Sequence, residues 1–150
     1  MLKIENMSQE EMRELLAANN FGHLGCARDN HPYVVPMNYG YDDERLFFFT
    51  TEGTKTEYIN ANREVCFQVE EIKSPSDWRS VMITGRAERV TLPDELERAM
   101  QIITKSNPTL TPAINKTEIG SWHRLNNIVV YRVRPEAVYG RKTAPFYSGE

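Results

Sequence analysis

The chain has 150 residues, 40% of them hydrophobic and 26% charged, with a formal net charge of −3. These values are ordinary for one globular domain, so we expect residues 1–150 to form a single domain. The small acidic excess argues against a general nucleic-acid binder, which normally carries a basic excess. No apolar run approaches the roughly 20 residues that cross a bilayer, and the first residues lack the apolar core of a signal peptide. We therefore expect a cytoplasmic protein with neither a nucleic-acid nor a membrane partner.

The first half of the chain predicts one helix followed by strands. Ser8 and Glu11 have the spacing of a capping box at the start of a helix over 7–18. Short apolar segments then alternate with turn residues, which predicts an antiparallel meander. Its three strands are 21–28, 33–41 and 46–50, and a short helix follows over 55–62.

The second half predicts longer strands and one more helix. Val65, Phe67 and Val69 alternate with polar residues, which is typical of a strand. A long strand follows over 78–90, with Gly85 a candidate bulge. Pro93 begins a helix that ends at 107–108, and the last strand runs over 128–133 and continues over 138–142. At least six strands against two well-formed helices predict a small β-barrel with peripheral helices.

The segment from Thr50 to Lys55 has the groups that bind a phosphate. It supplies hydroxyls, a glycine turn and one ammonium group. If Lys55 begins a helix, the free amides of that helix start add to the site. The alternative is a solvated loop in which Thr54 caps the helix.

A proline interrupts the strand before this segment. Pro36 cannot donate to a sheet ladder, so it marks an edge strand or a break in pairing. Backbone groups exposed there could bind the polar edge of a planar heterocycle, with Met37 or Tyr39 against its face. An ordinary edge strand explains the same residues. The segments Trp78-Arg79-Ser80-Val81 and Ser121-Trp122-His123-Arg124 each combine an aromatic ring with cations, which can pack on a flavin or bind an anion. Alternatively, Trp78 and Trp122 anchor loops or a dimer interface.

The remaining reactive side chains form no recognisable centre. His23, His31 and His123 lie far apart in the sequence without a second ligand type at metal spacing, so no metal site is predicted. Cys26 and Cys66 lie in strand-like segments, and we expect both thiols to be reduced. No motif of a serine or cysteine nucleophile is present, so no catalytic residue is assigned.

In their order, these segments resemble the flavin-binding split barrels related to pyridoxamine 5'-phosphate oxidase, and most of all the nitroimidazole-resistance-type branch. The resemblance spans about residues 8–140. The matching text is Gly22-His23-Leu24-Gly25-Cys26-Ala27, Pro32-Tyr33-Val34-Val35-Pro36-Met37-Asn38-Tyr39, Phe47-Phe48-Phe49-Thr50-Thr51, Gly53-Thr54-Lys55, Ile59, Asn62, Val65-Cys66-Phe67, Trp78-Arg79-Ser80-Val81 and Gly85-Arg86-Ala87.

The resemblance implies a mainly β (α+β) fold, a six- to seven-stranded antiparallel split β-barrel with peripheral helices. It also implies a homodimer that binds FMN, or alternatively FAD, at the subunit interface. Four residues would line the isoalloxazine ring: Val35, Pro36, Met37 and Asn38. Four would hold the ribityl phosphate: Thr50, Thr51, Thr54 and Lys55. Arg79 and Ser80 would lie near the flavin, and Trp122 and Arg141 would reach it from the partner subunit.

Departures from the family pattern narrow the expected activity. Pyridoxamine oxidases have an arginine where this chain has Tyr33-Val34, and an arginine-lysine pair where it has Thr54-Lys55. An arginine-rich substrate motif near the C-terminus has no counterpart here, which argues against pyridoxamine phosphate oxidation. The leading hypothesis is a flavin reductase or oxidoreductase that passes electrons from a nicotinamide donor to a small oxidised acceptor. The alternatives are a non-enzymatic flavin carrier or sensor, a haem-binding split barrel with a histidine ligand, and an interaction domain without a cofactor.

Overall fold

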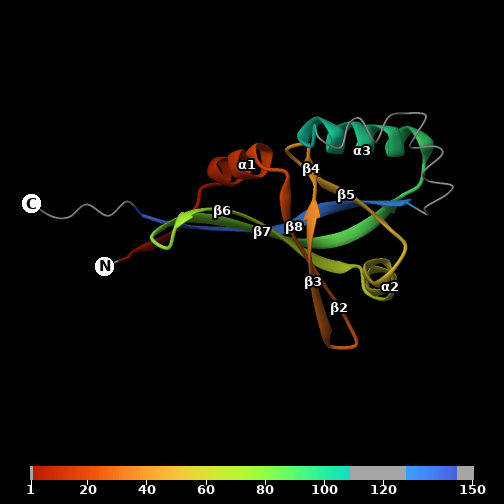
Figure 1. Ribbon diagram of the computed structural model, residues 1–150, viewed down its shortest axis with the longest axis horizontal. Coiled ribbons are helices and arrows are strands. Elements are labelled where there is room, and N and C mark those ends of the chain that lie inside the picture. Colours follow the sequence, from red (N-terminus) through yellow and green to blue (C-terminus); the bar gives the residue numbers. More distant parts are fainter. Residues whose placement is uncertain (1, 109–127, 145–150) are drawn as a thin grey trace, which may run out of the picture.

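The computed structural model describes residues 2–108 and 128–144, and this part of the chain contains one large sheet and three helices (Figure 1). Its elements follow the order β1 (Ile4–Asn6), α1 (Gln9–Ala18), β2 (Phe21–Arg28), β3 (His31–Asn38), β4 (Gly40–Tyr41), β5 (Leu46–Thr51), α2 (Thr54–Ala61), β6 (Glu64–Ser74), β7 (Asp77–Val90), α3 (Pro93–Ser106) and β8 (Ile128–Thr143).

All pairings in the sheet are antiparallel, and the strand order is β3-β2-β6-β7-β8-β5-β4, with β1 on β8. No pairing between β3 and β4 closes the sheet in the described part of the chain. The predicted class, an antiparallel split barrel with peripheral helices, is confirmed. The sheet has eight strands rather than the predicted six or seven. The additional strands are short: β1 has three residues and β4 has two. Strands so short leave no periodic signal in the sequence.

A tight hairpin joins β2 and β3. Asp29 and Asn30 both have positive φ, 50° and 65°, as a two-residue turn between twisted strands requires. The pairing therefore begins at Arg28 and His31, and β3 starts two residues earlier than predicted. Pro32 lies inside the strand rather than in the turn.

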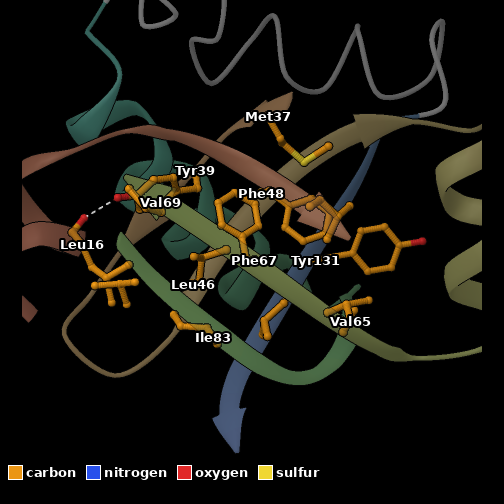
Figure 2. Packing of buried hydrophobic residues seen from close by; sticks show 14 of the residues in the cluster. Leu16, Met37, Tyr39, Leu46, Phe48, Val65, Phe67, Val69, Ile83 and Tyr131 are labelled. Carbon is orange, nitrogen blue, oxygen red and sulfur yellow. Dashed lines mark hydrogen bonds between the residues drawn. The ribbon is translucent and has the colours of Figure 1, made fainter. Parts of the chain in front are cut away.

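The first and last strands of the predicted meander are present, but its middle strand is divided into β3 and β4. The segment 33–41 does not run as one strand, because its first part pairs with β2 and its last two residues pair with β5. Tyr39 lies at the break, fully buried, with its N–H donating to the carbonyl of Asn20 over 2.9 Å. Its hydroxyl donates to the carbonyl of Leu16 over 2.6 Å (Figure 2). These contacts direct the chain from one edge of the sheet to the other.

A bulge lets the longest strands pair over most of their length. The register between β7 and β8 shifts at Thr84/Gly85, where Gly85 pairs with Pro135. A Cβ on Gly85 would lie 2.3 Å from the carbonyl oxygen of Arg134, so no side chain fits there. The predicted bulge at Gly85 is therefore confirmed, and β8 continues through its proline as one strand.

The side chains of the barrel alternate between an interior and an outer face. One interior row crosses four strands through Val35, Leu24, Phe67 and Ile83. Figure 2 shows the aromatic part of this core, in which the ring centroids of Phe48 and Tyr131 lie 5.3 Å apart.

The three helices cover different parts of the sheet. Helix α1 packs Met12, Leu15 and Leu16 into the interior cluster, and the predicted capping box of Ser8 and Glu11 is present. Helix α3 covers a second apolar cluster, formed with β5, β7 and β8. None of the helices in the described ranges is long and apolar enough to cross a bilayer.

Candidate functional site

The four residues predicted to line a ring lie on β3, which has only β2 as a neighbour and so forms an edge of the sheet. Alternation divides their side chains between two sides. Met37 is buried in the core and Val35 packs against that core. Pro36 is exposed on the opposite side, across from His23 on β2. A flat ligand could therefore contact the backbone edge of β3, but not all four side chains on one face.

Asn38, the last residue of β3, belongs to a network of amides. Its Nδ2 donates to Oδ1 of Asn107 over 3.0 Å and to the carbonyl of Asn20 over 3.3 Å. Asn107 is 1% exposed, and its Nδ2 donates to the carbonyls of Tyr39 and Ile103 over 2.9 and 2.7 Å. The sequence predicts Asn107 only as the end of a helix. Its asparagine-proline pair gives no signal for a bond to a residue 69 positions away.

The predicted phosphate residues lie where β5 ends and α2 begins. Thr50 is buried, whereas Thr51 and Thr54 are exposed and Lys55 is half-buried. Helix α2 starts one residue earlier than predicted, and Gly53 is its N-cap in place of Thr54. Because glycine has no side chain to cap the helix, the backbone amides of the first turn of α2 are open to another acceptor.

The charges around this loop are unequal. Glu52 pairs with Arg89, and that bond, followed by one from Thr56, holds the pKa of the Glu52 carboxyl below its usual range. Lys55 has no ion-pair partner among the described residues. Burial raises the pKa of the Cys26 thiol and the Lys55 ammonium opposes this shift, so the two groups lie within electrostatic reach of each other. The loop therefore retains one unneutralised cation.

Arg79 and Ser80 are neighbours on β7 but face opposite sides of the sheet. The Arg79 guanidinium pairs with Glu71 over 2.5 Å on the side of the sheet that α1 covers, and Asn19 at the end of that helix also bonds Glu71. The Arg79 guanidinium thus already has an ion-pair partner within the fold. Ser80 lies on the outer face, where its Oγ accepts a hydrogen bond from Gln68 over 2.8 Å.

Arg141 on β8 is the Cα partner of Ser80, so these two predicted residues come together within one chain. The guanidinium of Arg141 is exposed and has no hydrogen-bond or ion-pair partner among the described residues. Trp122, the last predicted site residue, lies outside the described residues, as does His123. The structure thus places the other predicted residues in three groups, at the β3 edge, at the β5–α2 loop and on β7 and β8. Within the third group, Ser80 and Arg141 share the outer face, whereas Arg79 faces the side that α1 covers.

The outer face of β2, β3, β6, β7 and β8 has large apolar side chains that remain in solvent. The exposed fractions are 51% for Phe21, 66% for Val34, 36% for Met82 and 55% for Tyr139. An open, mainly apolar hollow of about 430 Å³ lies on the same face between β2, β3 and β6, with Cys66 in its lining. Cys66 and Cys26 face opposite sides of adjacent strands, and both are free thiols.

Metal ligands do not converge in the described ranges: no group of three histidine, cysteine, aspartate or glutamate side chains is close enough to hold an ion. His31 is exposed at the hairpin turn and His23 is half-buried on the outer face. A haem-binding role for either histidine stays an untested alternative.

Known proteins resemble this chain over nearly its whole length. A family model described as pyridoxamine 5'-phosphate oxidase matches residues 8–142. The crystal structure of an FAD-binding protein from Mesorhizobium loti is 30% identical, with a TM-score of 0.76 over 94% of this chain and 99% of that one. A Bacteroides thetaiotaomicron protein, provisionally assigned to 5-nitroimidazole antibiotic resistance, is 20% identical, with a TM-score of 0.77 over 95% and 89% of the two chains.

Among curated proteins, an uncharacterized protein of Rhizobium meliloti (strain 1021) is 39% identical over 80 residues. That match covers 53% of this chain and 53% of the relative, so it spans about half the length of that protein. The family model and the Mesorhizobium structure, in contrast, each cover nine-tenths or more of the chain. The chain therefore belongs to the pyridoxamine 5'-phosphate oxidase family.

Proposed function

We propose that this protein binds a flavin, FMN or alternatively FAD, and is an oxidoreductase that passes electrons from a nicotinamide donor to a small oxidised acceptor. The observation that carries the proposal is Lys55, a half-buried cation without an ion-pair partner in the described chain, at the open first turn of α2. The name of the Mesorhizobium relative, an FAD-binding protein, supports a flavin of either kind.

The residues present fit such a cofactor. A phosphate needs hydrogen-bond donors and positive charge, and the loop offers the amides of the first turn of α2, the hydroxyls of Thr51 and Thr54 and the Lys55 ammonium. A Cβ on Gly53 would meet no atom within 4 Å, so the loop has space beside its backbone. The free edge of β3 supplies backbone groups for the polar rim of a ring.

When bound, the flavin would supply the hydride and electron chemistry itself, so the chain needs to bind and orient it. Lys55 would neutralise the phosphate, and Thr51 and Thr54 would fix its position beside the first turn of α2. Val35 and Met37 would exclude water from the interior side of the ring.

A homodimer is part of the proposal. The outer face exposes Phe21 and Val34 on β2 and β3, and Met82 and Tyr139 on β7 and β8, which is unusual for a surface that stays in solvent. A second copy would cover this face and place its own residues against the ring. Ser80 and Arg141 lie on the same face and would meet the partner or the cofactor there.

The acceptor is expected to lack the phosphate of the vitamin B6 substrates. Tyr33 and Val34 replace a cation of the pyridoxamine oxidases, and Val34 is 66% exposed on the outer face. The hollow beside it is lined by apolar groups, and its one charged residue is Glu64, which pairs with Arg86 over 3.5 Å. A small neutral acceptor suits this surface better than an anion.

The direct test is a spectrum of the purified protein with FMN and with FAD. We expect absorbance bands near roughly 370 and 450 nm, the usual flavin maxima, that stay with the protein through a desalting column. Bleaching of these bands on addition of NADH or NADPH would support the oxidoreductase. Bound flavin without such bleaching would favour a carrier or sensor, and failure to retain either flavin would overturn the proposal.

A further inference from the structure

The orientation of the Asn107 amide is determined by its surroundings. Its Nδ2 lies 2.9 Å from the carbonyl oxygen of Tyr39 and 2.7 Å from that of Ile103. Carbonyl oxygens only accept, so the nitrogen of the amide must be the atom that faces them. The Oδ1 of Asn107 therefore points the other way, toward Asn38 on β3.

This orientation determines that of Asn38 in turn. Oδ1 of Asn107 is an acceptor, and the carbonyl oxygen of Asn20 is a second one, so the atom of Asn38 that faces both must be Nδ2. Rotating the Asn38 amide by 180° would place its oxygen against two other oxygens. Rotating Asn107 would break two hydrogen bonds inside a buried site, where unpaired polar groups are costly.

The amides of Asn107 and Asn38 thus each have one fixed orientation, and the acceptor Oδ1 of Asn38 is unpaired among the described residues. Both N–H groups of Asn38 are used, whereas its Oδ1 has no hydrogen-bond partner among the described residues. The side chain is half-buried at the end of the edge strand, next to the backbone that carries the predicted ring contacts. Because the Asn38 amide cannot rotate, a ligand bound at this point of the β3 edge meets only a hydrogen-bond acceptor from this side chain.

We propose that Asn107 is a positioning residue that holds Asn38 so that its Oδ1 accepts a hydrogen bond from N3–H of the flavin ring. The inference rests on the proposed flavin function and deepens it. The oxidised isoalloxazine ring carries a single N–H, at N3, between two carbonyl groups. A freely rotating amide could offer its nitrogen to those carbonyls instead, whereas the locked amide of Asn38 selects the N–H.

The test compares FMN with 3-methyl-FMN, in which N3 carries a methyl group and cannot donate. The wild-type protein should bind FMN roughly threefold to tenfold more tightly than 3-methyl-FMN, the range of one neutral hydrogen bond. In Asn38→Leu, which keeps the bulk but not the acceptor, FMN affinity should fall to that of the methylated flavin and the ratio should approach one. Titration of flavin fluorescence gives both dissociation constants.

Asn107→Ala tests the positioning step. This variant leaves Asn38 in place but frees its amide to rotate, so the affinity ratio should also fall toward one. A purely structural role would weaken both flavins equally and leave the ratio unchanged. If Asn107→Ala does not fold, Asn38→Leu still decides the acceptor. Asn60→Ala, an exposed asparagine on α2, is the matched control and should keep the wild-type ratio.

The outcomes separate this inference from the function on which it rests. Wild-type protein that binds neither flavin would overturn the flavin function itself. Wild-type protein that binds both flavins equally, or a ratio that survives Asn38→Leu, would overturn the Asn38 contact while leaving flavin binding intact.

Discussion

At the scale of single residues, Lys55 is the test of the phosphate loop. Lys55→Ala should weaken FMN binding by about 1–3 kcal/mol, the range for a lost charge-assisted hydrogen bond, because no other cation of the loop is unpaired in the described chain. Thermal stability should change little, since the ammonium has no ion-pair partner there. Lys73→Ala, an exposed lysine on β6, is the matched control. A stability loss with unchanged FMN affinity would make Lys55 a structural residue.

The residues of the candidate site were predictable where the signal was local. Gly53 and Lys55 are close in the chain, and the loop between a strand and a helix is visible in the sequence. The alternation of β7 separates Arg79 from Ser80, because neighbouring residues of a strand face opposite sides. Asn107 could not be predicted, since its partners Asn38 and Tyr39 come near it only when β3 ends beside α3.

At the scale of elements, an ion pair adds to the apolar packing that holds α1 on the sheet. Glu11 serves twice, in the capping box with Ser8 and in a contact with Lys142 on β8 over 2.5 Å. The Lys142 ammonium, with the backbone amide of Ser8, lowers the pKa of Glu11 from 4.5 to about 2. This contribution to stability is present in full above pH 4.5 and is lost as the pH falls toward 2.

Glu11→Gln should therefore lower the melting temperature at pH 7, and the difference from wild type should shrink as the pH falls from 4.5 toward 2. Melting curves by circular dichroism between pH 2 and 7 measure this difference. Glu14→Gln on the same helix removes a carboxylate that has no ion pair among residues 2–108 and 128–144, and serves as the control. A difference that stays constant over the whole pH range would contradict the role of the ion pair.

Most elements were predictable because their signals are local, and the exceptions share one cause. The capping box, the strand periodicity and the glycine bulge all act within a few residues. In contrast, β1 exists through its pairing with β8 at the far end of the chain. The break at Tyr39 likewise depends on Leu16 and Asn20, which accept its hydrogen bonds. Long-range partners of this kind leave no local pattern.

At the scale of the whole molecule, the outer face tests the proposed homodimer. Met82 lies in the middle of this face, with Gln68 and Tyr139 as its Cα partners. If a second copy covers this face, Met82→Glu would bury a charged carboxylate among apolar side chains in the interface. Burying an unpaired charge is costly. We expect the variant to elute as a monomer by size-exclusion chromatography with light scattering, while the wild type elutes at twice the monomer mass.

Leu92→Glu provides the control for this experiment. Leu92 is 61% exposed but caps helix α3, away from the outer face. A charge there should leave the mass in solution unchanged. A monomeric wild-type protein, or a Met82→Glu dimer as tight as that of the wild type, would argue that the outer face has another role.

The edge strand β3 poses a problem of its own, because an unpaired strand edge can add a strand from another molecule and begin aggregation. Pro32 and Pro36 pair with Ala27 and His23 without interrupting the register, so residues of this parity direct their N–H positions away from β2. At both prolines that position carries no hydrogen. The free edge therefore lacks two of the donors that an incoming strand would need, at positions on either side of Val34, yet its carbonyls remain open. Two prolines thus keep the edge usable by a small molecule while making it a poor template for another chain.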